Sequence, residues 1–238
     1  MQLDSALGVA VFCGLFGLAI LIVLWPGDRQ GARLLAKWGV PQAAPGQVAV
    51  AVKYLRRRRL WYPWLFIGLP FIPVGLPDSD GLGTIAATLL LGGLLAEVLA
   101  QRPARGHRRE AVLAPRGVLD CAPPWAIAVT ALVTAGSALY LAVAGKWALF
   151  ALTLAAAAVA WGVMLLAVRR PATGDVEVDL ALRCRSARVA LGLATGSCAV
   201  IAWPGGTFPS FLAFVATLAA FIAIVSPPRT LPDAATAK

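Results

Sequence analysis

Several residue types on which proteins build chemistry are rare or missing in this chain. Asparagine is absent from its 238 residues, so the chain offers no acceptor for N-glycosylation. Histidine occurs once, at His107, and one histidine cannot supply both axial ligands of a bis-histidine haem. The four cysteines are scattered, with no CxxC motif and no histidine at a zinc-site spacing. We therefore expect neither a metal site nor a disulfide framework.

Three further absences exclude particular classes of protein. Ser197 lies in an apolar run without a histidine, so it lacks the partner of a rhomboid-like serine dyad. Residues 208–225 contain no lysine that could hold a retinal Schiff base. The chain has no P-loop and no intramembrane acidic pair that could hold Mg²⁺ against a diphosphate. We therefore expect no cofactor, and the balance is against an enzyme.

Apolar sequence, by contrast, is abundant. Hydrophobic residues make up 60% of the chain and the mean hydropathy is +0.79, which is outside the usual range of soluble domains. Seven runs approach the ~20 residues needed to cross a ~30 Å hydrocarbon core. They cover residues 6–25, 60–76, 81–100, 125–144, 147–168, 187–203 and 208–225. The sequence predicts an all-α, polytopic transmembrane bundle, formed as a single integral membrane domain and followed by a short cytoplasmic tail at 226–238.

The basic residues are divided very unequally between the segments that join these runs. Of the 21 Lys and Arg, 20 lie in segments assigned to one side of the membrane and only Lys146 lies on the other. Such a bias marks the cytoplasmic side. It predicts an outside N-terminus, a cytoplasmic C-terminus and insertion in a bacterial plasma membrane. The net charge of +10 is then an orientation signal and not a nucleic-acid-binding surface.

Three of the basic segments are predicted to be helical. Residues 46–59 favour a helix that continues into the second span, with Pro45 in its first turn. Residues 175–188 begin acidic and end basic, which suits the helix macrodipole, and they favour a helix running into the sixth span. Residues 29–38 are typical of an amphipathic helix on the membrane surface. We expect Leu34, Leu35 and Trp38 on its lipid side and Arg33 and Lys37 in water.

Ionisable residues inside a membrane are functional candidates by default, and Glu97, in the third span, is the clearest one. It could form a proton site, a cation site or a gate. Alternatively, its carboxylate reaches the cytoplasmic boundary and pairs with Arg102 or Arg108. Asp120 precedes the fourth span at the interface, where a carboxylate suits a helix N-terminus or could contact a headgroup or substrate.

Two other features carry functional hypotheses. Arg56, Arg57, Arg58 and Arg59 form the densest charge cluster and are candidates for anionic lipid contact. Their alternative role is to set orientation only. Pro70 and Pro73 should break the second span, and broken helices line substrate sites in transporters. The alternative is a static kink.

Small residues predict close helix packing. Gly192 and Gly196 form a GxxxG motif in the sixth span, and Gly92 and Ala96 have the same spacing in the third. Such pairs let two helices approach closely. We expect a packing role at both places, and not a dedicated dimer interface.

Two basic blocks resemble segments of multi-pass membrane proteins of actinobacteria. The first is VKYLRRRRLWYP at 52–63, and the second is RGHRR at 105–109 followed by LAPR at 113–116. The similar proteins are hypothetical proteins without an assigned activity. The resemblance therefore implies a multi-pass membrane protein and a lineage, but no mechanism.

The sequence favours a non-catalytic integral membrane protein that acts as an accessory or partner subunit of a membrane complex. Its expected partners are the bilayer, anionic headgroups on the cytoplasmic side and another membrane protein. The first alternative is a small transporter or permease component that uses the broken second span. The second is a membrane-embedded enzyme acting on an apolar substrate, in the manner of small terpene cyclases, with Glu97 and Asp120 as its only carboxylates.

Overall fold

The computed structural model describes residues 3–23, 25–71, 82–101, 117–169, 175–203 and 207–227. Every regular element in this part of the chain is helical. The elements are α1 (Leu3–Val23), α2 (Asp28–Lys37), α3 (Pro45–Leu60), α4 (Tyr62–Gly68), the 3-10 turn η1 (Leu69–Phe71), α5 (Leu82–Ala100), α6 (Val118–Cys121), α7 (Pro124–Val143), α8 (Trp147–Arg169), α9 (Val176–Ala202) and α10 (Phe208–Val225).

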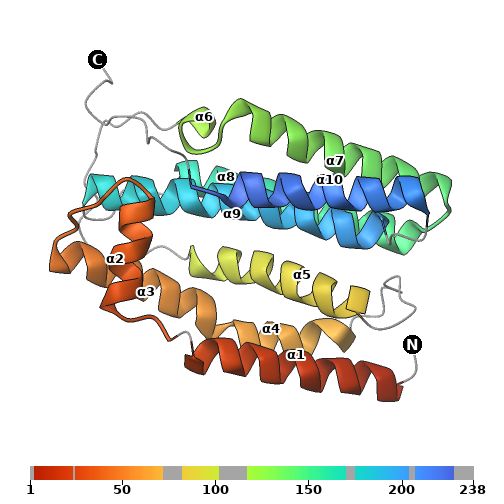
Figure 1. Ribbon diagram of the computed structural model, residues 1–238, viewed down its shortest axis with the longest axis horizontal. Helices are drawn as coiled ribbons and strands as arrows, with labels where there is room; N and C mark the ends of the chain where they lie inside the picture. Colours follow the sequence, from red (N-terminus) through yellow and green to blue (C-terminus); the bar gives the residue numbers. More distant parts are fainter. Residues whose placement is uncertain are drawn as a thin grey trace.

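The long helices lie side by side and alternate in direction along the chain (Figure 1). α1, α5, α8 and α10 run one way, and α4, α7 and α9 run the other way. Within the described residues, four helical segments are long and apolar enough to cross a membrane: Gly83–Ala100, Pro124–Val143, Trp147–Arg169 and Phe208–Val225. The count rises to five if Leu7–Val23 and Asp28–Lys37 are taken together as one span, with a bend of 94° between them. The prediction of an all-helical protein suited to a membrane is thus confirmed at this level.

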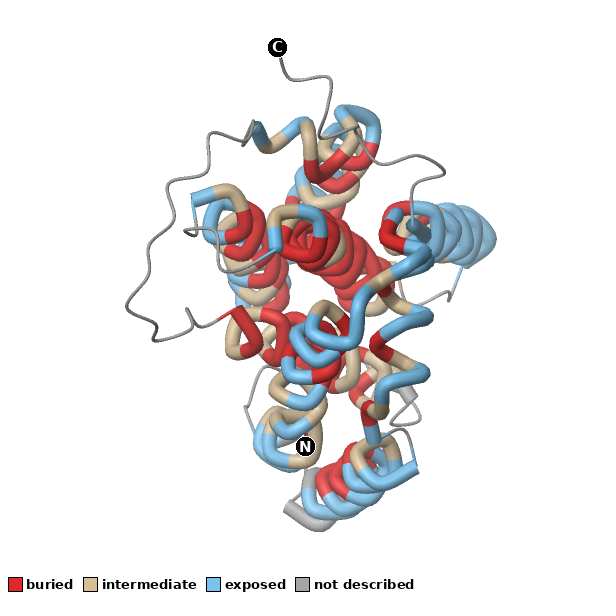
Figure 2. The backbone as a smooth tube through the Cα atoms, turned by 90° about the vertical axis from the view of Figure 1, so that its left-hand side faces the viewer, coloured by how far each residue is buried: buried red, intermediate tan, exposed pale blue. Residues whose placement is uncertain are grey.

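α9 forms the centre of the bundle. It packs against α8, α10, α5 and α7, and buried residues concentrate in the middle of the bundle, with exposed residues around it (Figure 2). α9 is a continuous 27-residue helix, so the predicted helix at 175–188 does run into the predicted sixth span at 187–203. Its many Ala, Gly and Ser residues let neighbouring helices approach closely. A Cβ added to Gly192 would lie 2.3 Å from Val225 Cγ2, and one added to Gly196 would lie 3.3 Å from the Phe221 ring.

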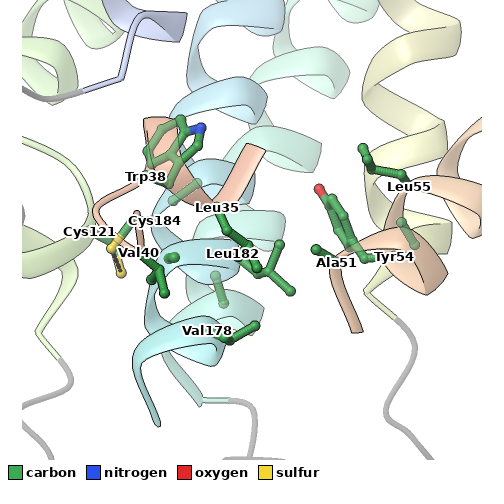
Figure 3. Close-up of a cluster of buried hydrophobic side chains, with 14 of the residues drawn as sticks. Leu35, Trp38, Val40, Ala51, Tyr54, Leu55, Cys121, Val178, Leu182 and Cys184 are labelled. Atoms are coloured by element: carbon green, nitrogen blue, oxygen red, sulfur yellow. Dashed lines mark hydrogen bonds between the residues drawn. The ribbon is translucent and has the colours of Figure 1, made fainter. Parts of the chain in front are cut away.

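The expectation that the apolar face of α2 lies against lipid is wrong for two of its residues. Leu35 and Trp38 are buried within the protein and do not face lipid. They lie in the same apolar cluster as residues of α3 and α9 (Figure 3). α3 approaches so closely that a Cβ on Gly31 would lie 2.7 Å from Val52 Cγ2. Arg33 and Lys37 are exposed, as expected.

The second predicted span begins as α4 and changes character at its proline. The α-helix ends at Gly68 and continues as the 3-10 turn Leu69–Phe71, which contains Pro70. A proline removes one backbone donor and clashes with the preceding turn, which accounts for the change. Pro73 lies outside the described residues. α4 packs against α5, where a Cβ on Gly92 would lie 2.4 Å from the Phe66 ring, and Ala96, one turn further on, is fully buried.

Candidate functional site

The candidate site lies where α3, α5 and α9 meet, and Glu97 is at its centre. Glu97 is in the last turn of α5 and has 0% of its surface exposed. Arg58 of α3 places its Nε 2.9 Å from Glu97 Oε2, with 14% of the Arg58 side chain exposed. The sequence had offered Arg102 and Arg108 as partners, and both lie outside the described residues. Among the described residues, the ion-pair partner of Glu97 is Arg58, a member of the arginine cluster.

Two hydroxyl groups donate hydrogen bonds to the other carboxylate oxygen of Glu97, Oε1. Tyr54, one turn before Arg58 in α3, donates a short hydrogen bond to Oε1. Ser186 of α9 donates to the same oxygen at 2.5 Å. Arg185 Nη1 donates to the Tyr54 hydroxyl at 2.6 Å, and its guanidinium lies 5.2 Å from the centroid of the Tyr54 ring. Burial raises the pKa of Tyr54 above its ordinary value, so the phenol stays protonated and remains a donor.

This arrangement satisfies a charge that would otherwise be costly. A buried carboxylate is tolerated when it is paired and hydrogen-bonded, because its attraction to the partner offsets its lost hydration. Here Arg58, Tyr54 and Ser186 supply that compensation from two other helices. The network therefore joins three helices at one end of the bundle.

Two arginines of α9 connect further helices at the same end. Arg183 donates to the backbone carbonyl oxygen of Ala167 at 3.0 Å and also pairs with Asp179, whose Oδ2 is 2.6 Å from Arg183 Nε. Arg188 donates from Nε to the carbonyl oxygen of Ile224 at 2.9 Å. Both carbonyls lie in the last turn of their helix, α8 and α10 respectively, where no backbone donor remains. Both arginines are nearly fully buried, at 6% and 4% exposure.

The sequence did not predict that Arg183 and Arg188 bind the C-terminal carbonyl oxygens of α8 and α10. It had assigned the arginines of 183–188 to membrane orientation. The i, i+4 spacing of Asp179 and Arg183 was a signal for the ion pair, but nothing in the sequence identified which helix end either arginine would reach. A cation at a helix C-terminus also interacts favourably with the macrodipole. The α9 arginines thus stabilise the ends of α8 and α10.

The four consecutive arginines point in different directions, as expected for adjacent residues of one helix. Arg58 faces Glu97, whereas Arg59 Nη1 donates to Gln30 Oε1 at 2.9 Å. Arg56 Nε donates to the Pro26 carbonyl oxygen at 3.2 Å, and its guanidinium lies 5.6 Å from the Trp25 ring. The cluster therefore does not form one surface.

A surface groove of about 460 Å³ lies beside Arg56. Its charged lining consists of Lys53, Arg56, Arg57 and Asp28, and Trp25 also lines it. The remaining lining is apolar: Ala49, Val52 and Leu60. Three cations against one carboxylate give the groove a positive balance, which suits an anionic group with an apolar tail.

Asp120, the predicted interfacial carboxylate, lies in a different part of the chain from Glu97. Asp120 lies in the short helix α6, and its Oδ2 accepts a hydrogen bond from the Gly117 backbone N–H at 2.7 Å. It therefore caps α6, one turn before α7 begins.

Comparison with protein-family models, curated proteins and solved structures gives no match. Function is accordingly inferred from the geometry.

Proposed function

We propose that this chain is a seven-span plasma-membrane protein that acts as a non-catalytic accessory or partner subunit. Its N-terminus would lie outside and its C-terminus in the cytoplasm. The proposed spans are α1, α4 with the residues that follow it, α5, α7, α8, α9 and α10. The remaining helices, α2, α3 and α6, would lie at the cytoplasmic surface.

The alternating directions of the long helices support this topology (Figure 1). α5, α8 and α10 end toward the side of the bundle on which α9 begins (Figure 1), and arginines bind a residue in the last turn of each of these three helices. Lys and Arg concentrate on the cytoplasmic side of membrane proteins. The end that holds Arg58, Arg183 and Arg188 is accordingly the proposed cytoplasmic one.

The accessory role is supported by the charged groups at the proposed cytoplasmic end, which bind one another and the ends of neighbouring helices. Glu97 is bound by Arg58, Tyr54 and Ser186, while Arg183 and Arg188 bind helix ends. These groups hold α3, α5, α8, α9 and α10 in one arrangement. A bundle fixed in this way suits a protein that presents its outer surface to a partner.

The test is stoichiometric co-purification from the native host in mild detergent, combined with reciprocal deletion. We expect one membrane protein to be recovered in a fixed ratio and to lose abundance when this chain is deleted. A purified chain that alone transports or transforms a substrate in proteoliposomes would overturn the proposal.

A small transporter component is the second candidate, and the Arg58–Glu97 pair favours it. This ion pair joins α3, which leads along the chain into the interrupted helix α4–η1, to the end of α5. Opening of the pair could release the cytoplasmic ends of the two helices. Glu97→Gln and Pro70→Ala should then alter transport by the reconstituted chain, while Asp120→Asn should not. Unchanged transport in both variants would exclude this use of the pair.

Anionic lipid is the proposed partner of the groove at Trp25. Lys53 and Arg57 line it alongside Arg56, and a tryptophan in its lining is suited to the headgroup region. Clusters of basic residues at the cytoplasmic surface attract acidic headgroups. The groove would hold the phosphate near its cations and an acyl chain along Val52 and Leu60.

A further inference from the structure

The fold brings two cysteines together that the sequence leaves unrelated. Cys121 ends α6 and Cys184 lies in α9, and their sulfur atoms are 3.1 Å apart (Figure 3). The Cys184 thiol donates toward Cys121 Sγ and lies 3.6 Å from the Asp120 carbonyl oxygen. Two cysteines that are 63 residues apart in the sequence are thus adjacent in space. Cys13 and Cys198, the other two cysteines, are also buried but lie in α1 and in the distal half of α9.

The surroundings of the two thiols are unequal. Both are buried, and Cys121, at 7% exposure, is more accessible than Cys184, at 1%. The hydrogen bond from Cys184 and the nearby Arg183 lower the pKa of the Cys121 thiol, and this outweighs burial and the carboxylates of Asp120 and Asp179, which raise it. Since the thiolate is the reactive form of cysteine, Cys121 is the nucleophile of the pair and Cys184 is placed to react second.

We propose that Cys121 and Cys184 form a reversible dithiol–disulfide site that reacts with hydroperoxides. The Cys121 thiolate attacks the O–O bond, forming a sulfenic acid and releasing hydroxide, which takes a proton to become water. Cys184 sulfur then attacks the sulfenic sulfur and forms the S–S bond, and its thiol proton leaves with the displaced hydroxyl as a second water. The two thiols lose two electrons and hydrogen peroxide is reduced to two waters. Soluble thiols reverse the bond by exchange.

The fold gives this bond a structural consequence. The sulfur atoms need to approach from 3.1 Å to a bond length of about 2.05 Å. The bond would then join α6, which leads into α7, to α9 at a point covered by the apolar cluster of Leu35 and Trp38 (Figure 3). In the oxidised chain, a covalent bond would therefore hold α6 against α9. The inference does not depend on the accessory role or on transport.

The test uses the full chain, purified in detergent after reduction and treated with hydrogen peroxide. Thiols are counted after denaturation with a mass-tagged maleimide, and linked peptides are mapped by mass spectrometry. We expect the count to fall from four to two, with Cys121 joined to Cys184, and to return to four after incubation with a soluble thiol. Cys121→Ser and Cys184→Ser should each abolish the link, whereas the matched controls Cys13→Ser and Cys198→Ser should retain it.

A second measurement separates the two roles. In Cys184→Ser, a dimedone probe should label a sulfenic acid at Cys121, whereas Cys121→Ser should give no label at Cys184. Four free thiols in the treated wild-type chain would overturn the proposal, as would equal loss at Cys13 and Cys198. A link that soluble thiols cannot open would also overturn it. Mapping in the wild-type chain decides the matter even if a serine variant does not fold.

Discussion

Glu97 and Arg58 are charged side chains in a place from which the protein excludes most water. Their pairing is worth little as a net gain over an apolar pair, because both charges lose hydration. Each is nevertheless essential to the other, since removal of one leaves an uncompensated charge. Tyr54 and Ser186 complete the hydrogen bonding of the carboxylate. At the scale of single residues, the site is therefore a set of mutually dependent groups.

This dependence predicts a non-additive mutational effect. Glu97→Leu should lower the free energy of unfolding by about 3–5 kcal/mol, because it leaves Arg58 buried without a partner. The double variant Glu97→Leu/Arg58→Leu should lose less than the sum of the two single variants. Denaturant titration in detergent measures all three. Glu177→Gln, at an exposed carboxylate of α9, is the control and should change stability little. Strict additivity would contradict the coupling.

At the scale of elements, close helix packing requires glycine at positions where a larger side chain would clash with the neighbouring helix. Gly192 lies beneath α10, with Val225 and Phe221 around the position of its missing Cβ. Gly162 of α8 has nothing within 4 Å of that position. The two glycines therefore lie in helices of the same bundle but differ in what a larger residue would meet.

The difference predicts opposite tolerance to one substitution. Gly192→Leu should overpack the α9–α10 contact and lower the free energy of unfolding by about 1–3 kcal/mol or more. Gly162→Leu should be tolerated, since its side chain enters open space at the outer face of α8. Thermal unfolding of the two variants in the same detergent compares them. Equal stability would show that α10 does not pack on α9 as described.

The groove beside α3 leads to a second prediction about an element. Lys53→Gln/Arg57→Gln should weaken binding of phosphatidylglycerol by about thirtyfold, at about 1 kcal/mol for each cation near a headgroup. Native mass spectrometry with phosphatidylglycerol and phosphatidylcholine measures the preference. The control is Arg33→Gln/Lys37→Gln, which removes equal charge from the exposed side of α2. If both double variants lose the same affinity, the effect is one of net charge and not of the groove.

At the scale of the whole molecule, alternating helices and one-sided charge lead to a testable orientation. A phosphatase fused after Gly145, in the turn between α7 and α8, should be active outside the cell. A green fluorescent protein fused after Pro227 should be fluorescent, because it folds in the cytoplasm. Activity of both fusions on the same side would refute the proposed passage of α8, α9 and α10. Inactive phosphatase with a dark fluorescent protein would indicate the inverted orientation.

The sequence by itself determined where most of the long helices lie. The predicted span 208–225 coincides with α10, and 147–168 differs from α8 by one residue. Helix length and apolar composition are local properties, so they can be read along the chain. The interruption at Pro70 was also foreseeable, because proline acts on its own helix.

Only the tertiary structure decided which distant residues meet. Arg58 and Glu97 are brought together by the contact of α3 with α5, and Arg188 reaches Ile224 because α10 folds back along α9. The contact of α6 with α9 likewise pairs Cys121 with Cys184. The burial of Leu35 depends on what covers α2, which no periodicity specifies. An amphipathic helix has the same sequence pattern whether protein or lipid covers its apolar face. In the same way, the sequence does not distinguish an arginine that faces a lipid headgroup from one that binds a buried backbone carbonyl.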